Sequence, residues 1–72
     1  MNFGKNQIFL LDNWKQVADR LHGNVFNNPK FASGEYIVTS RIISQNGHYV
    51  TTQSGSIYQL ITPSLYINKG IL

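Results

Sequence analysis

The 72-residue chain contains no cysteine, so disulfide bonds and thiolate metal sites are excluded. A domain of this size buries only about 60% of the surface that its unfolded chain exposes, and it usually needs a further source of stability. The three carboxylates and two histidines are scattered along the sequence, which argues against a structural metal site. Association is then the available source of stability, so we expect residues 1–72 to form a single domain that assembles as a homo-oligomer.

Charged side chains are also scarce, at 12% of residues against about 25% in typical soluble domains. Either copies of the chain cover much of the surface, or Asn, Gln, Ser and Thr provide the solubility. The net charge is +3, and the six basic residues are spread from Lys5 to Lys69 without a run of three. This distribution favours a small anionic ligand over an extended nucleic-acid stripe.

Long apolar runs are missing too. The run from Ile8 to Leu11 is far shorter than the ~18 residues that a membrane-spanning helix needs. The N-terminus lacks the longer apolar region and the small-residue cleavage site of a signal peptide. We therefore expect a cytoplasmic protein with no membrane partner.

Catalytic motifs are absent from the sequence. It has no P-loop, no dinucleotide-binding Gly-rich loop, no GxSxG, no HExxH and no cysteine nucleophile. His48 has no carboxylate near it in sequence that would orient it as a general base. We expect a non-enzymatic protein without a cofactor.

Residues 12–22 have the spacing of an amphipathic helix. Apolar side chains recur at i, i+3, i+4 and i+7, namely Trp14, Val17, Ala18 and Leu21. Asp12 or Asn13 is suited to cap the N-terminus of this helix, and Gly23 to end it. The preceding segment, QIFLL, fits either a short strand or a lead into the helix.

The C-terminal segment TPSLYINKGIL predicts a second, short helix. Thr62 is suited to the N-cap, Pro63 to the first helical position, and Gly70 to the end. The apolar residues of this tail pack either on a neighbouring subunit or on the chain's own sheet, and the sequence leaves both arrangements open.

Residues 35–61 predict three antiparallel strands, roughly 35–44, 48–53 and 56–61. Asn46-Gly47 is the strongest hairpin signal, and as a two-residue loop it places Gln45 opposite His48. Ser54-Gly55 marks the next turn, with its length of two or three residues left open. The predicted fold class is α+β: a small antiparallel β-sheet or an SH3-like partial barrel, with one N-terminal helix and a short C-terminal helix.

Arg41 is the most informative polar residue, because it lies in an otherwise apolar predicted strand. Its charge is met either by solvent or by an anionic ligand such as a phosphate. Hydroxyls and rings that could complete a nucleotide-sized site are contributed by Thr39, Thr52, Ser54, His48, Tyr49 and Tyr58. The same set of side chains would also suit a protein–protein surface.

The segments LHGNVFNNPKF, GEYIVTSRI and YVTTQSGSIYQL together resemble a group of short phage and bacterial proteins. The shared pattern is carried by Leu21, Gly23, Pro29, Phe31, Gly34, Thr39, Ser40, Ile42, Val50, Thr52, Ser54, Gly55, Ser56, Tyr58 and Leu60. The resemblance implies a small β-rich accessory protein, often phage-encoded, of the counter-defence type. Some such proteins resemble oligomeric sponges that trap nucleotide immune signals, and others bind a host protein.

The leading hypothesis is therefore a homo-oligomeric protein that sequesters an anionic, nucleotide-type ligand. One alternative is an inhibitor or adaptor that binds a host defence protein through the same sheet. A second is a small barrel that binds nucleic acid, which the dispersed lysines favour less.

Overall fold

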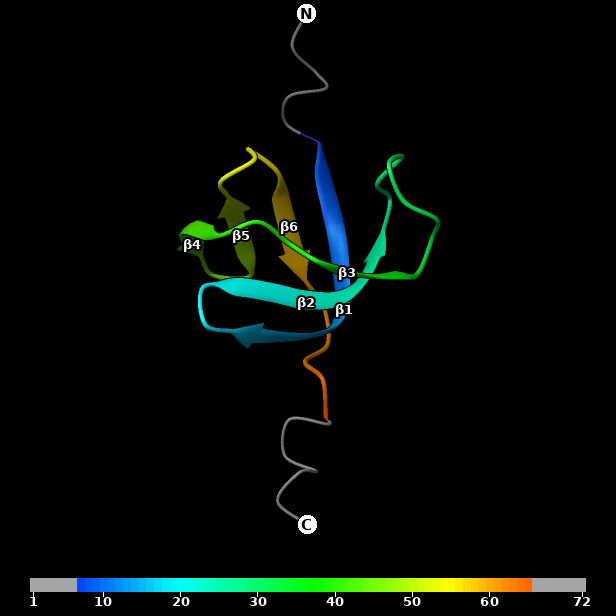
Figure 1. Cartoon of the computed structure of the whole chain (residues 1–72), viewed down its shortest axis with the longest axis horizontal. Helices are drawn as coiled ribbons and strands as arrows, with labels where there is room; N and C mark the ends of the chain where they lie inside the picture. Colours follow the sequence, from blue (N-terminus) through cyan, green and yellow to red (C-terminus); the bar gives the residue numbers. More distant parts are fainter. Residues whose placement is uncertain (1–6, 66–72) are drawn as a thin grey trace, which may run out of the picture.

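The computed structural model describes residues 7–65, and these form six strands in one mixed sheet without a helix. The strands are β1 (Ile8–Val17), β2 (Arg20–Phe26), β3 (Glu35–Val38), β4 (Ile42–Asn46), β5 (Tyr49–Thr52) and β6 (Ile57–Leu60). Their order across the sheet is β3-β2-β1-β6-β5-β4 (Figure 1). β1 and β6 pair in parallel, and the other neighbouring strands pair antiparallel. The described fold is all-β.

The predicted α+β class and the predicted helix over residues 12–22 are therefore wrong. That segment contains the second half of β1, a turn at Ala18 and Asp19, and the start of β2. Val17 pairs with Arg20 across the turn, and Ala18 has a φ of 56°, which a continuous right-handed helix excludes. A helix of this length is marginal by itself, whereas β2 gains a hydrogen-bonded partner on each side.

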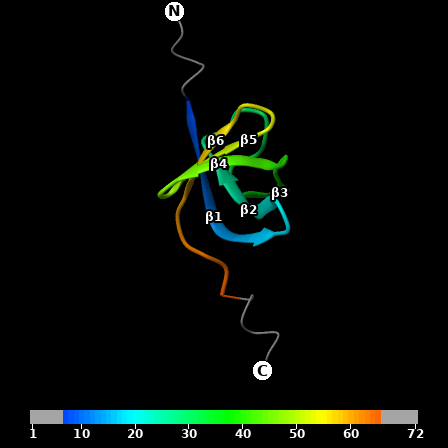
Figure 2. The same ribbon diagram turned by 90° about the vertical axis from the view of Figure 1, so that its left-hand side faces the viewer.

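A bulge bends β1 in the middle. The pairing of β1 with β2 shifts register between Asp12 and Lys15, and Asn13 has a φ of 52°. In Figure 1 the first part of β1 runs nearly vertically and its last part turns to run along β2, and Figure 2 shows the same bend from the side. The backbone of Trp14 leaves the ladder with β2: its N–H donates to the Thr62 carbonyl, and its carbonyl accepts from the Ser64 N–H.

Gly23 is buried on β2 opposite this bulge. A Cβ atom at this position would lie 2.8 Å from the Asp12 carbonyl oxygen and 3.2 Å from the Cα of Trp14. Both obstacles are backbone atoms, so neither can move aside by a rotamer change. The predicted role of Gly23 as a helix end is wrong; the glycine allows two backbones to approach closely.

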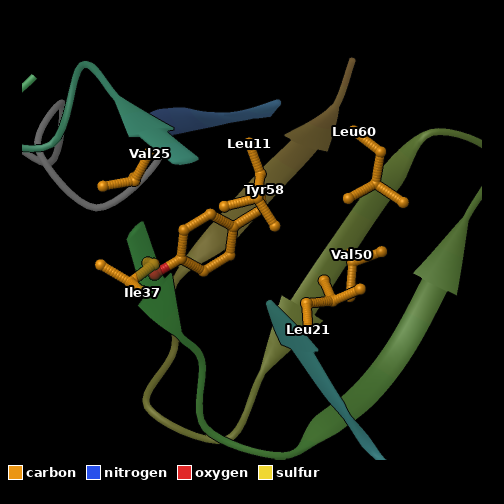
Figure 3. Packing of buried hydrophobic residues seen from close by; sticks show 7 residues of the cluster. All are labelled: Leu11, Leu21, Val25, Ile37, Val50, Tyr58 and Leu60. Carbon is orange, nitrogen blue, oxygen red and sulfur yellow. The ribbon is translucent and has the colours of Figure 1, made fainter. Parts of the chain in front are cut away.

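The core lies on the concave face of the curled sheet. It consists of Leu11, Leu21, Val25, Ile37, Val50, Tyr58 and Leu60, which converge in Figure 3. Phe9, Trp14, Phe31 and Ile42 pack against this cluster. The Ile42 N–H donates to the Asp19 carbonyl at 2.7 Å, so the start of β4 meets the β1–β2 turn. This contact brings the β4 edge back towards β2 and encloses the core.

The two predicted turns between residues 46 and 55 are present. Asn46 pairs with Tyr49, so the loop is Gly47-His48, one residue later than predicted, and Gln45 lies opposite Val50 instead of His48. Gly47 supplies the positive φ of this turn, at 63°. Tyr58 lies opposite Val50, which corresponds to the longer of the two turns considered at Ser54-Gly55.

Two further expectations differ from the structure. The single strand predicted for 35–44 is divided into β3 and β4 by an irregular segment, Thr39 to Arg41. Residues 62–65 are not helical, and the rest of the predicted C-terminal helix lies outside the described residues. None of residues 7–65 forms a helix with the length and hydrophobicity that crossing a bilayer requires.

Candidate functional site

The residues predicted to form a binding site are divided between the two ends of β5 and the core. Thr52 and Ser54 lie at one end of β5, close to Arg41, whose carbonyl accepts the Gln53 N–H. His48 and Tyr49 lie at the opposite end of β5 and are exposed. The structure thus brings Arg41, Thr52 and Ser54 together and separates them from His48 and Tyr49.

Tyr58 is a core residue. Its side chain is 5% exposed, and its ring packs against Phe9 with the ring centroids 5.7 Å apart. Burial raises the pKa of the Tyr58 hydroxyl above its ordinary value of 10.0. The ring is therefore not available for stacking on a ligand.

Thr39 is also buried and has a structural role. It extends the pairing of β2 beyond the end of β3: the Thr39 N–H donates to the Leu21 carbonyl at 2.8 Å. In return, the Leu21 N–H donates to the Thr39 hydroxyl at 3.0 Å, where a regular ladder would use the backbone carbonyl. The hydroxyl donates onward to the Ser40 carbonyl.

Replacing Thr39 with valine should lower the free energy of unfolding by about 1–3 kcal/mol, because the buried Leu21 N–H then loses its acceptor. Urea unfolding followed by tryptophan fluorescence would measure the change. The matched control is Thr39→Ser, which keeps the hydroxyl and should retain most of the stability. Equal losses in both variants would contradict the hydrogen-bonding role.

A network of hydroxyls occupies the corner between the β3–β4 segment and the β5–β6 turn. The Ser40 hydroxyl accepts from the Ser54 N–H at 3.1 Å and donates to the Ser54 hydroxyl at 3.3 Å. The Ser54 hydroxyl is also 3.3 Å from the hydroxyls of Ser56 and of the buried Thr52. Ser54 is exposed, and Ser40 and Ser56 are partly exposed, so this network can reach a ligand.

Two arginines adjoin this network. Arg41 is exposed, and its Nε donates to Asp19 Oδ2 at 2.6 Å. Arg20, at the start of β2, donates from Nη1 to the Thr39 carbonyl at 3.2 Å. Arg20 and Arg41 thus flank the segment that carries Ser40. We name Arg20, Arg41, Ser40, Ser54 and Ser56 the arginine–serine corner.

Asp19 partly offsets the positive charge of this corner. The hydrogen bond from the Arg41 side chain is the main cause that lowers the pKa of Asp19 below its ordinary value of 3.8. An arriving anion would compete with Asp19 for Arg41. Because the pair is largely exposed, we expect it to be weak and exchangeable.

The depressed pKa of Asp19 predicts a pH-dependent difference between the wild type and Asp19→Asn. A carboxyl whose pKa is lowered by folding stabilises the native state above its unfolded pKa, and this contribution is lost as the pH falls through the folded value. The wild type should be slightly more stable than Asp19→Asn near pH 6, and the difference should shrink as the pH falls below the ordinary pKa of 3.8. Thermal unfolding at a series of pH values measures it. If the stability difference between the wild type and Asp19→Asn grew as the pH fell, Asp19 would not have a lowered pKa in the folded state.

Arg20, Ser40 and Ser56 were not predicted as site residues, because residues 12–22 were expected to form a helix and the site was expected on the strands after residue 35. A signal for Arg20 was present. From Leu21 to Val25 the sequence alternates, with Leu21, Gly23 and Val25 inward and the residues between them outward. That period of two indicates a strand and places Arg20 and His22 on its outer face.

Comparisons with family models, with curated proteins and with solved structures gave no match. Within residues 7–65, no three His, Cys, Asp or Glu side chains lie together in an arrangement that could hold a metal ion. The chemistry that this corner offers is anion binding through guanidinium groups and hydroxyls.

Proposed function

We propose that this protein binds an anionic, nucleotide-type ligand without transforming it, and sequesters it as a homo-oligomer. The observation that carries the proposal is the arginine–serine corner. Arg20 and Arg41 come from separate parts of the chain and flank the segment of Ser40, whose hydroxyl is linked to those of Ser54 and Ser56. A guanidinium fork suits a phosphate, and hydroxyls complete its hydrogen bonding.

Isothermal titration with a panel of mononucleotides and cyclic di- and trinucleotides tests this proposal. Arg41→Ala should weaken the binding of a ligand from this panel by about tenfold or more, because it removes a charge-assisted hydrogen bond. Asp19→Asn should strengthen binding, because the competing carboxylate is gone. The matched control is Lys30→Ala, which removes a positive charge from the β2–β3 loop and should have little effect.

Absence of binding to every nucleotide, with a host protein recovered by an Arg41-dependent pull-down, would favour the alternative of a protein–protein inhibitor. Chromatography of the ligand after incubation tests the non-enzymatic part of the proposal. The ligand should be recovered chemically unchanged.

The outer face of β1, β6 and β5 supports the homo-oligomer. Pairing places on it Ile8, Leu10, Tyr49, Thr51, Ile57 and Gln59. The lysines and arginines among residues 7–65 belong to the second half of β1, to β2 and to loops. Two copies, each with a net charge of +3, can therefore meet at this face without opposing their basic groups. Tyr49→Lys should lower the mass measured by light scattering.

A further inference from the structure

The outer face of β2 and β3 has a composition different from the rest of the sheet. Pairing places Lys15 and Val38 on either side of His22, and Tyr36 beside Asn24. Directly paired residues share one face of a sheet. Arg20 is two residues before His22 on the same strand, so its side chain lies on this face too. We name Lys15, Arg20, His22, Asn24, Tyr36 and Val38 the β2–β3 outer face.

Tyr36 is held as an exposed ring on this face. Its side chain is 51% exposed, in contrast to the buried Tyr58. The His22 ring contacts it edge-on, with the centroids 6.3 Å apart and an interplanar angle of 71°. The adjacent Val38 is 52% exposed and extends the apolar surface. An exposed, supported ring of this kind offers a stacking platform for a nucleic-acid base.

Positive charge surrounds this platform. Lys15 and Arg20 lie on the face itself, and Arg41 lies beyond its Arg20 end, in the arginine–serine corner. These are three of the four lysines and arginines among residues 7–65, the fourth being Lys30. The sequence spreads them over 27 positions, from 15 to 41 inclusive, but the pairing of β1 with β2 and the contact of Arg41 with Asp19 bring them to one side of the sheet.

The nearby carboxylates are occupied by other groups. Asp12 pairs with Asn24 at the far end of the face, and its Oδ1 accepts the Thr62 N–H. Glu35 pairs with Val25, which points inward, and its Oε1 accepts the Ala32 N–H. Asp19 is bound to Arg41. With Lys15 and Arg20 on the face and Asp12 at its far end, the balance of charge on the face is positive.

We propose that the β2–β3 outer face binds single-stranded nucleic acid, with a base on Tyr36 and phosphates at Lys15 and Arg20. The face spans about 13 Å along β2 from Arg20 to Asn24, at about 3.3 Å per residue. It is a strand surface with an exposed ring, which suits unpaired bases, whereas a duplex hides its base faces. The proposal rests on the proposed function only through Arg20, which belongs to both surfaces.

Fluorescence anisotropy with labelled oligo-dT and oligo-U at low salt tests this inference. Tyr36→Ala should weaken binding by about tenfold or more through loss of stacking, and Tyr36→Phe should preserve it. Lys15→Ala should reduce the slope of log affinity against log salt by about 0.7, the contribution of one phosphate contact to a single strand. The matched control is Lys30→Ala, which removes a charge from the β2–β3 loop and should leave binding unchanged.

The outcomes separate this inference from the proposed function. Arg41→Ala should weaken nucleotide binding by about tenfold or more while largely sparing oligo-dT, and Tyr36→Ala should do the reverse. Equal affinity for duplex DNA or for anionic phospholipid vesicles would overturn the inference, since it would show a general polyanion surface. Full binding by a Tyr36→Ala variant whose circular dichroism matches the wild type would also overturn it.

Discussion

Replacing Leu21 with alanine is expected to lower the free energy of unfolding by about 2–5 kcal/mol. Leu21 is 1% exposed, and its backbone also carries the reciprocal bonds to Thr39. A 72-residue domain has a total stability of about 4–11 kcal/mol at the usual values per residue. A single cavity at this position therefore removes a large part of it.

Urea unfolding measures the Leu21→Ala effect, and circular dichroism at low temperature shows whether any folded population remains. Leu65→Ala is the matched control, because Leu65 is 70% exposed and the same truncation there should change stability by less than about 0.5 kcal/mol. Equal effects in the two variants would contradict the assignment of Leu21 to the core.

Replacing Gly23 with valine is expected to prevent or severely weaken folding. Even the Cβ of alanine would meet the Asp12 carbonyl at 2.8 Å, which should cost about 1–3 kcal/mol, and the two methyls of valine add to that. On intrinsic strand propensity alone, valine would be favoured over glycine. A loss of stability in Gly23→Val would show the close approach of the two backbones at the bulge, whereas a gain would show ordinary strand propensity.

The control for Gly23→Val is His22→Val, at the neighbouring outward position of the same strand. It adds the same side chain where the surface is partly open, and it should change the unfolding midpoint much less. A Gly23→Val protein as stable as the wild type would show that the two backbones are not in close contact.

Many of the residues on which we based the expected resemblance to short phage and bacterial proteins occupy structural positions. Leu21, Val50, Tyr58 and Leu60 are in the core, and Gly23 faces the bulge. Gly34 and Gly55 have φ values of 85° and 92°, which glycine adopts without strain. Ser40, Ser54 and Ser56 of this set also belong to the arginine–serine corner, whereas Lys15, Arg20, Tyr36 and Arg41 lie outside the set.

Local chemistry was sufficient to predict part of this molecule. Turns near Gly47 and Gly55 follow from the need for positive φ, and the strands beside them follow from alternation of apolar and polar residues. The cross-strand partners of Val50 and Tyr58 could be predicted only to within one residue. The exact register depended on the lengths of the loops at Gly47 and Gly55.

The amino-acid order alone thus established a small β-rich unit without crosslinks, its two C-terminal turns and the scarcity of charge. Three-dimensional packing decided the state of residues 12–22, whose apolar spacing fits a helix but whose backbone forms a hairpin that pairs with β3 and with the segment after β6. It also decided where the charges meet, because Arg41 reaches Asp19, the residue before Arg20, only when the start of β4 meets the β1–β2 turn. Such pairing is non-local, and no window of sequence contains the contacts that stabilise it.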